Sequence, residues 1–155
     1  IFGDQNEWEI ASGVPHIPFE ALDENYEIDK EAYLEYFRKM HKLFPKCKKM
    51  VMAVRNQIAS SHHTLSGLLY DSQEDKLYTT RIYDIQPIID PMGVGDAFVA
   101  AYIHAHQKWG DENQYCLDFS LSASAIKNTI PGDQNLVSEE EIIHNMTSSG
   151  GRIQR

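Results

Sequence analysis

The chain has 155 residues, enough for one domain with a buried core. Its 23 acidic side chains outnumber 14 basic ones, and the formal net charge is −9. This charge argues against a nucleic acid or an anionic membrane as the partner, because phosphate binding needs clustered Lys and Arg. The sequence has no apolar run long enough to cross a bilayer. Its two cysteines, Cys47 and Cys116, lack C-x-x-C spacing, which favours a reduced, cytoplasmic setting.

The first part of the chain predicts two helices between two strands. Residues 1–4 resemble the end of a strand, and a short helix follows that Asn6 opens. Asp29 is the expected N-cap of a helix over 29–44, with acids in its first turn and bases toward its end, as the helix dipole prefers. Residues 49–55 form a nearly continuous apolar run, typical of a buried strand in a parallel sheet.

The second part predicts further strands and helices that alternate. Strands are expected at 66–70, 76–84 and 85–90, and helices at 97–109, 113–128 and 138–146, the last with a capping box of Ser138 and Glu141. The helix over 113–128 carries small residues that would let a flat group approach closely: Ser120, Ser122, Ala123, Ser124 and Ala125. Helices that alternate with buried strands indicate the α/β class with a mainly parallel sheet.

The stretch DPMGVGDAF, residues 90–98, places two glycines and an acid where a strand gives way to a helix. The first N–H groups of a helix have no partner within it, so Gly93, Val94 and Gly95 are expected to form an anion cradle. A carboxylate beside a phosphate is repelled, unless Asp96 faces a hydroxyl that loses a proton while it attacks the phosphate. Asp96 could also be an ordinary helix-start acid, and the short pattern alone is weak evidence. No Gly-Lys-Ser/Thr follows, which excludes a Walker A loop.

The same stretch resembles the second signature of the PfkB (ribokinase-like) carbohydrate kinases, D-T-x-G-A-G-D-x-F. NEWE at 6–9 matches the N-x-x-E motif of that family, and AVRNQIASSHHTLSGLLY and ASAIKNTIPGDQNLVS are similar to its 2-keto-3-deoxygluconate kinases. Pro91 and Val94 depart from the usual Thr and Ala. The resemblance runs over the whole chain but over only about the C-terminal half of such an enzyme. It implies a three-layer ribokinase-like fold, of which residues 1–155 are the nucleotide-binding and catalytic-base side.

The resemblance also implies roles on the sugar side of an active site. Asp96 would be the base that deprotonates the sugar hydroxyl, and the N–H groups of Gly93, Val94 and Gly95 would stabilise the transferred phosphoryl group. Asp133 matches a sugar-contacting position, although by itself it could be an ordinary turn residue. The expected reaction converts 2-keto-3-deoxygluconate to its 6-phosphate.

On the nucleotide side, the resemblance implies ATP and Mg²⁺ as cofactors. Arg55 would contact the nucleotide phosphates, while Leu121 and Ser124 would border the adenine. Asn6 and Glu9 would organise the magnesium ion and phosphates through water, a role for Asn6 that is compatible with its being a helix cap.

The interpretation is an ATP-dependent sugar kinase that acts on a small-molecule sugar or sugar acid, with a homo-oligomer left open. Two alternatives are another PfkB kinase of the fructokinase type and a non-catalytic nucleotide-binding fragment. Because the chain begins at Ile1 with strand-like residues, we expect it to begin inside a fold. The 155 residues alone are therefore expected to be inactive.

Overall fold

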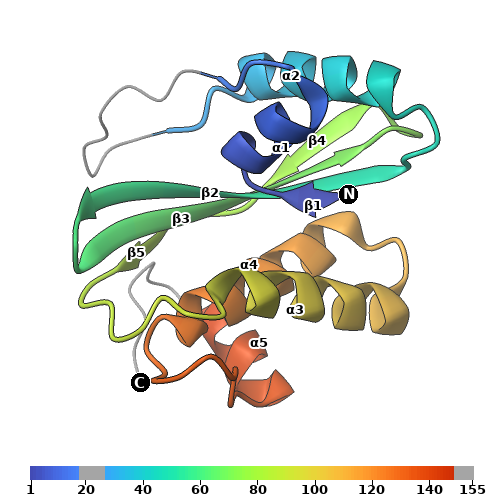
Figure 1. Ribbon diagram of the computed structural model, residues 1–155. Coiled ribbons are helices and arrows are strands. Elements are labelled where there is room, and N and C mark those ends of the chain that lie inside the picture. The colour runs from blue at the N-terminus through green and yellow to red at the C-terminus, as the bar shows by residue number, and fades with distance from the viewer. Residues whose placement is uncertain (18–26, 149–155) are drawn as a thin grey trace.

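The computed structural model describes residues 1–17 and 27–148, which form three layers (Figure 1). In chain order the elements are β1 (Phe2–Gly3), α1 (Gln5–Ser12), α2 (Lys30–Leu43), β2 (Lys49–Ala59), β3 (His62–Asp71), β4 (Lys76–Thr79), β5 (Tyr83–Ile85), α3 (Val94–Trp109), α4 (Asn113–Lys127) and α5 (Glu139–Thr147). Helices α1 and α2 cover one face of the sheet, α3 and α4 cover the other, and α5 packs on α4. None of the helices in these ranges is long and apolar enough to span a bilayer.

The sheet has the order β1-β2-β3-β4, with β5 also paired to β3. Strands β1 and β2 run parallel, whereas β2–β3, β3–β4 and β3–β5 are antiparallel. The α/β class is confirmed, but the prediction of a mainly parallel sheet is wrong for the described residues. A tight turn at Ser60 and Ser61 folds β2 back on β3 as a hairpin. This hairpin includes residues 56–59, which extend β2 beyond the predicted strand.

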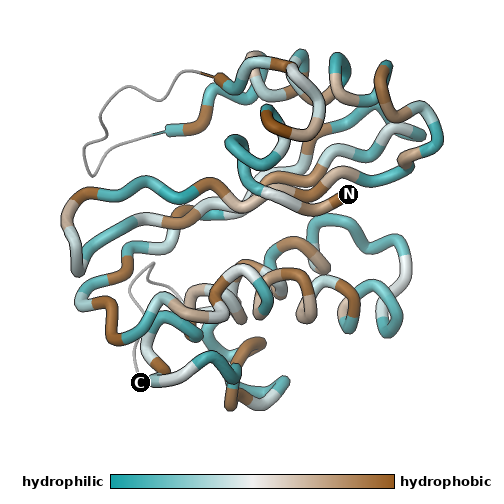
Figure 2. Tube along the Cα trace, in the orientation of Figure 1, coloured by the Kyte–Doolittle hydropathy of each residue, from teal (hydrophilic) through white to brown (hydrophobic). Residues whose placement is uncertain are grey.

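Residues 50–54 of β2 are all apolar because both faces of the strand are covered there. Met50, Met52 and Val54 belong to the core under α1 and α2, whereas Val51 and Ala53 pack into the core beneath α3 and α4. Hydrophobic residues accordingly recur along the central strands, between the two helical layers (Figure 2). A strand buried on both faces shows no polar alternation, whichever direction its neighbours run.

The segment before α3 is not the strand predicted for 85–90. Strand β5 ends at Ile85, and Pro87 has no N–H to offer a ladder. Ile88 instead donates its N–H to the carbonyl of Ser61 at 2.9 Å. The predicted strand over 76–84 is likewise divided into β4 and β5. The segment after β5 therefore leads to α3 through turn contacts rather than a ladder.

The small residues of α4 serve helix packing. The Ser122 hydroxyl donates to the carbonyl of Ile142 on α5 at 2.8 Å, and the Ser124 hydroxyl donates to that of Val94 on α3 at 3.1 Å. The five small residues between 120 and 125 are all buried. Contacts with two helices and the sheet thus occupy much of the space beside these residues, and a flat group beside Ser124 stays a prediction.

Two predicted helix starts are confirmed by their hydrogen bonds. The Asp29 carboxylate accepts the N–H of Ala32 at 3.0 Å. Ser138 and Glu141 form the expected capping box at α5, with bonds of 3.2 and 2.8 Å.

Candidate active site

The N-terminus of α3 presents free backbone N–H groups beside a carboxylate. Gly93 is the N-cap residue, its φ of 74° lies in the left-handed region, and no side chain caps this end. The N–H groups of the N-cap residue Gly93 and of Val94, Gly95 and Asp96 have no partner within the helix. Both Gly95 and Asp96 are exposed. This geometry suits the predicted anion cradle.

Two cavities adjoin at this helix end. The larger, of about 380 Å³, is lined in part by Val94 and Gly95, and the smaller, of about 360 Å³, by Gly95 and Asp96. Asp4, Ala53 and Gly95 line both, so the cavities form one depression. A Cβ atom at Gly95 would meet nothing within 4 Å and would project into open space. The cradle and the candidate base therefore face the same depression from neighbouring positions.

A second helix N-terminus reaches this depression from α1. Asp4 is its N-cap: its carboxylate accepts the N–H of Glu7 at 2.9 Å, and the Glu7 carboxylate accepts that of Asp4 at 2.9 Å. The prediction that Asn6 opens this helix is wrong, because D-x-x-E forms a capping box two residues earlier. Asn6 lies in the first turn, is exposed and lines the larger cavity. The first turn of α1 thus borders the depression, but the carboxylates of Asp4 and Glu7 already bond its N–H groups, so the uncapped N-terminus of α3 is the one that favours an anion.

Glu9 is engaged by His16 and lines neither cavity. Its carboxylate accepts the backbone N–H of His16 at 3.1 Å and also contacts the imidazole Nδ1. The hydrogen bond with the His16 side chain makes the largest contribution to lowering the pKa of Glu9 below its usual value, and the bond from the His16 backbone N–H lowers it further. Within residues 1–17 and 27–148, no three His, Cys, Asp or Glu side chains gather as a metal site. Mg²⁺ is usually held by one or two carboxylates together with waters and phosphates, so the water-mediated roles of Asn6 and Glu9 remain predictions.

Two of the three predicted nucleotide contacts lie at the larger cavity. Arg55 is exposed on β2 and lines it, as does Ser124, although the Ser124 hydroxyl is already bonded to Val94. Leu121 is completely buried in the core beneath α3 and lines neither cavity. The proposed contact between Leu121 and adenine therefore has no geometric support in this structure.

The backbone of Asp133 lies beside the cradle, although Asp133 is among the lining residues of neither cavity, and its sugar contact stays a prediction. A Cβ atom on Gly93 would overlap the backbone oxygen of Asp133. Asp133 is also exposed. The contact with Gly93 brings the turn after α4 to the N-terminus of α3.

Sequence reasoning missed three residues of this region. His16 lines the larger cavity, and the carboxylate of Asp90 joins the turn before α3 to the turn after α4. Lys127 is fully buried at the end of α4. Asp90 is the first residue of the DPMGVGDAF stretch and could have been recognised from it. Its bond to Gly132 could not, because that residue lies 42 residues further along the chain.

Comparison with solved structures places this geometry in a known fold. The 2-dehydro-3-deoxygluconokinase from Thermotoga maritima matches with a TM-score of 0.79 at 23% identity, over 95% of this chain and 40% of the kinase. A PfkB family carbohydrate kinase from Listeria grayi matches with a TM-score of 0.69 at 26% identity, over 82% of this chain and 37% of the kinase. This chain has the fold of the PfkB carbohydrate kinases.

The resemblance to PfkB kinases noted in the sequence is thus confirmed at the level of the fold. A proposed 2-keto-3-deoxygluconate kinase from Enterococcus faecalis also matches, with a TM-score of 0.70 at 19% identity, over 92% of this chain and 38% of that protein. The chain therefore spans about two fifths of the length of these PfkB-fold structures. No protein-family model and no curated protein matches it.

Proposed function

We propose that the complete enzyme containing this chain is an ATP-dependent sugar kinase that phosphorylates the 6-hydroxyl of 2-keto-3-deoxygluconate. One observation carries most of the proposal: Asp96 adjoins the uncapped N-terminus of α3 at a depression, in a chain with the fold of PfkB kinases. Residues 1–155 would form the nucleotide-binding and catalytic-base side of the kinase domain. The cysteine usage supports a cytoplasmic location.

In the proposed reaction, Asp96 accepts the proton of the sugar hydroxyl. The hydroxyl oxygen forms a bond to the γ-phosphorus of ATP as the bond from that phosphorus to the β–γ bridging oxygen breaks, and ADP leaves. The N–H groups of Gly93, Val94 and Gly95 would stabilise negative charge on the transferred group. Mg²⁺ bound to ATP would neutralise phosphate charge.

The larger cavity is the proposed place of the ATP phosphates. Arg55 of β2 and Asn6 of α1 both line it, as does Gly95 in the first turn of α3. A guanidinium group and the uncapped N-terminus of α3 together favour a polyanion. We retain Ser124 near the adenine and Glu9 in the water shell of the magnesium ion as parts of this proposal.

The choice of sugar acid rests on the solved structures with this fold, one of which is a 2-dehydro-3-deoxygluconokinase. The test is ADP release by the complete enzyme with ATP, Mg²⁺ and a panel of 2-keto-3-deoxygluconate, fructose and ribose. The proposal expects the highest kcat/KM for 2-keto-3-deoxygluconate. A clear preference for fructose would replace this substrate with the fructokinase-type alternative, and turnover with none of the sugars would contradict a sugar kinase of this kind.

The 155-residue chain by itself is expected to give no turnover in the same assay. Its described residues offer two proposed sugar contacts, Asp96 and Asp133, and positioning supplies much of the rate enhancement in such a reaction. The measurement is ADP release with ATP, Mg²⁺ and 2-keto-3-deoxygluconate, compared with an Asp96→Asn chain as background. Sugar-dependent release well above that background would show that this portion of the fold is sufficient.

Asp133→Ala in the complete enzyme is expected to raise the KM for the sugar and leave the KM for ATP unchanged. Loss of one hydrogen bond from a sugar hydroxyl costs about 1–3 kcal/mol, which corresponds to a KM increase of roughly 5- to 150-fold. Gln134→Ala, which truncates the neighbouring exposed side chain, is the matched control. If both variants show the wild-type KM for the sugar, Asp133 is a turn residue only.

A further inference from the structure

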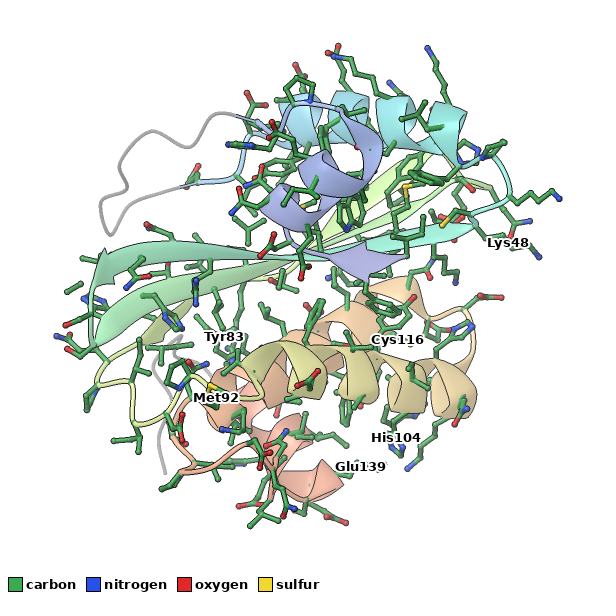
Figure 3. The ribbon with its side chains drawn as sticks, in the orientation of Figure 1. Lys48, Tyr83, Met92, His104, Cys116 and Glu139 are labelled. Atoms are coloured by element: carbon green, nitrogen blue, oxygen red, sulfur yellow. The ribbon has the colours of Figure 1, made fainter. Side chains whose placement is uncertain are left out.

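One carboxylate connects two turns that meet beside the candidate base. Oδ1 of Asp90 accepts the N–H of Met92 at 3.0 Å, and Oδ2 accepts that of Gly132 at 2.8 Å. Met92, labelled in Figure 3, lies just before α3. The bond to Met92 is local, but the bond to Gly132 reaches across the fold. Asp90 therefore joins the 90–93 turn to the 128–133 turn.

Backbone contacts bring these turns together at two further points. The N–H groups of Ile89 and Asp90 both donate to the carbonyl of Asn128, at 2.8 and 3.2 Å. At the other end, Gly93 packs so closely on the backbone oxygen of Asp133 that no Cβ would fit. Since Gly93 is the N-cap of α3, a shift of the 128–133 turn would displace the N–H groups of the cradle.

A buried positive charge lies under the same turn. Lys127, the last residue of α4, is fully buried, and its ammonium group donates to the carbonyl of Ile130 at 3.0 Å. Within the described parts of the chain, no carboxylate lies within ion-pair distance of it. The pKa of Asp90 is lowered chiefly by the N–H groups of Met92 and Gly132, and the charge of Lys127 lowers it further.

A buried ammonium group with a single carbonyl partner costs free energy, because desolvation of the charge is only partly compensated. A lysine at the end of a helix also stabilises the last carbonyls, which would be a purely structural role. That role does not require complete burial, since an exposed lysine interacts with the helix dipole as well. The burial of Lys127 and its bond to the Ile130 carbonyl within the 128–133 turn indicate a task at this turn.

We propose that Asp90 and Lys127 are a pair of positioning residues that hold the 128–133 turn against the N-terminus of α3. They thereby fix Asp133 relative to Asp96 and to the N–H groups of the cradle. This inference rests on the proposed kinase function for its effect on catalysis. Neither side chain is assigned a contact with ATP or sugar.

The test uses Asp90→Asn, Lys127→Met and the double variant in the complete enzyme. Asp90→Asn removes the negative charge. The amide also has only one oxygen that can accept a hydrogen bond, whereas the carboxylate accepts one on each of its two oxygens. Each single variant is expected to lower kcat by about 10-fold or more, the worth of a charge-assisted hydrogen bond, with the KM for ATP nearly unchanged. The double variant should have a kcat only slightly below that of the less active single variant, because both residues hold the same contact between the two turns. Lys108→Met, which removes an exposed lysine of α3, is the control.

Lys127→Met separates positioning from simple structure. Replacement of a buried charge by an apolar side chain of similar length is often neutral or stabilising, so the melting temperature should hold or rise. A merely structural lysine then predicts unchanged kcat, whereas a positioning lysine predicts lower kcat in a protein that is at least as stable. A kcat within about twofold of wild type for both single variants would overturn the proposal.

Hydrogen exchange provides a readout that does not depend on kinase activity. Peptides covering 88–98 and 128–136 should exchange faster in both variants. Asp90→Asn weakens the acceptor of the Met92 and Gly132 N–H groups, and Lys127→Met removes the positive charge that supports this acceptor. If the wild-type protein proves to have no kinase activity but exchange changes as expected, the proposed function fails and the pairing of the turns stands. Unchanged exchange at both segments would remove the pair from this role.

Discussion

Asp96→Asn in the complete enzyme is expected to lower kcat by roughly 10²- to 10⁴-fold, the usual worth of a positioned general base. The asparagine amide has nearly the same shape as the carboxylate but cannot accept the proton of the sugar hydroxyl. Asp96 is exposed in the first turn of α3, so the substitution removes no buried contact. The measurement is steady-state kinetics together with ATP binding by calorimetry, and the affinity for ATP should be retained.

Glu140→Gln is the matched control for Asp96. Glu140 is likewise exposed in the first turn of a helix, α5, but lines neither cavity. Glu140→Gln removes the same charge from the first turn of a helix, here one that Ser138 caps, and should retain wild-type kcat. An Asp96→Asn enzyme with more than about a tenth of wild-type kcat would exclude Asp96 as the base.

Gly93→Ala should be the most damaging change of the cradle that removes no charge. A side chain at φ 74° costs about 1–2 kcal/mol, and the new Cβ would also overlap the backbone of Asp133. Because backbone must move to relieve the overlap, we expect a total loss of roughly 2–5 kcal/mol in the free energy of unfolding. Displacement of the N–H groups by about 1 Å should in addition lower kcat by about 10². Denaturant unfolding and steady-state kinetics measure the two effects.

Gly13→Ala separates the cost of placing a side chain on a left-handed backbone from the cost of the overlap with Asp133. Gly13, the C-cap of α1, has φ 70° and ψ 6°, close to the 74° and 5° of Gly93, but its Cβ would meet nothing within 4 Å. Gly13→Ala should lower the free energy of unfolding by only the backbone cost of about 1–2 kcal/mol and leave kcat unchanged. Equal losses of stability in the two variants, with normal kcat in both, would mean that the contact with Asp133 does not position the cradle.

The sequence alone predicted the features that depend on neighbours along the chain. The caps at Asp29 and Ser138 and the glycine turn before α3 are local, because a helix start is set by a few consecutive residues. The same locality made an error at α1 avoidable, since Asp4 and Glu7 stand three residues apart. The signature in 90–98 likewise indicated the fold now found by comparison.

The tertiary structure decided what depends on residues far apart in the sequence. Both faces of β2 are covered over residues 50–54, so this apolar run could not reveal that β3 pairs with it antiparallel. The small residues of α4, whose size could have admitted a ligand, instead make contacts with α3 and α5. The bond from Gly132 to Asp90 and the burial of Lys127 exist only once the 128–133 turn folds onto α3. Local propensity fixes where a chain bends, but side-chain packing across the fold fixes which bends meet.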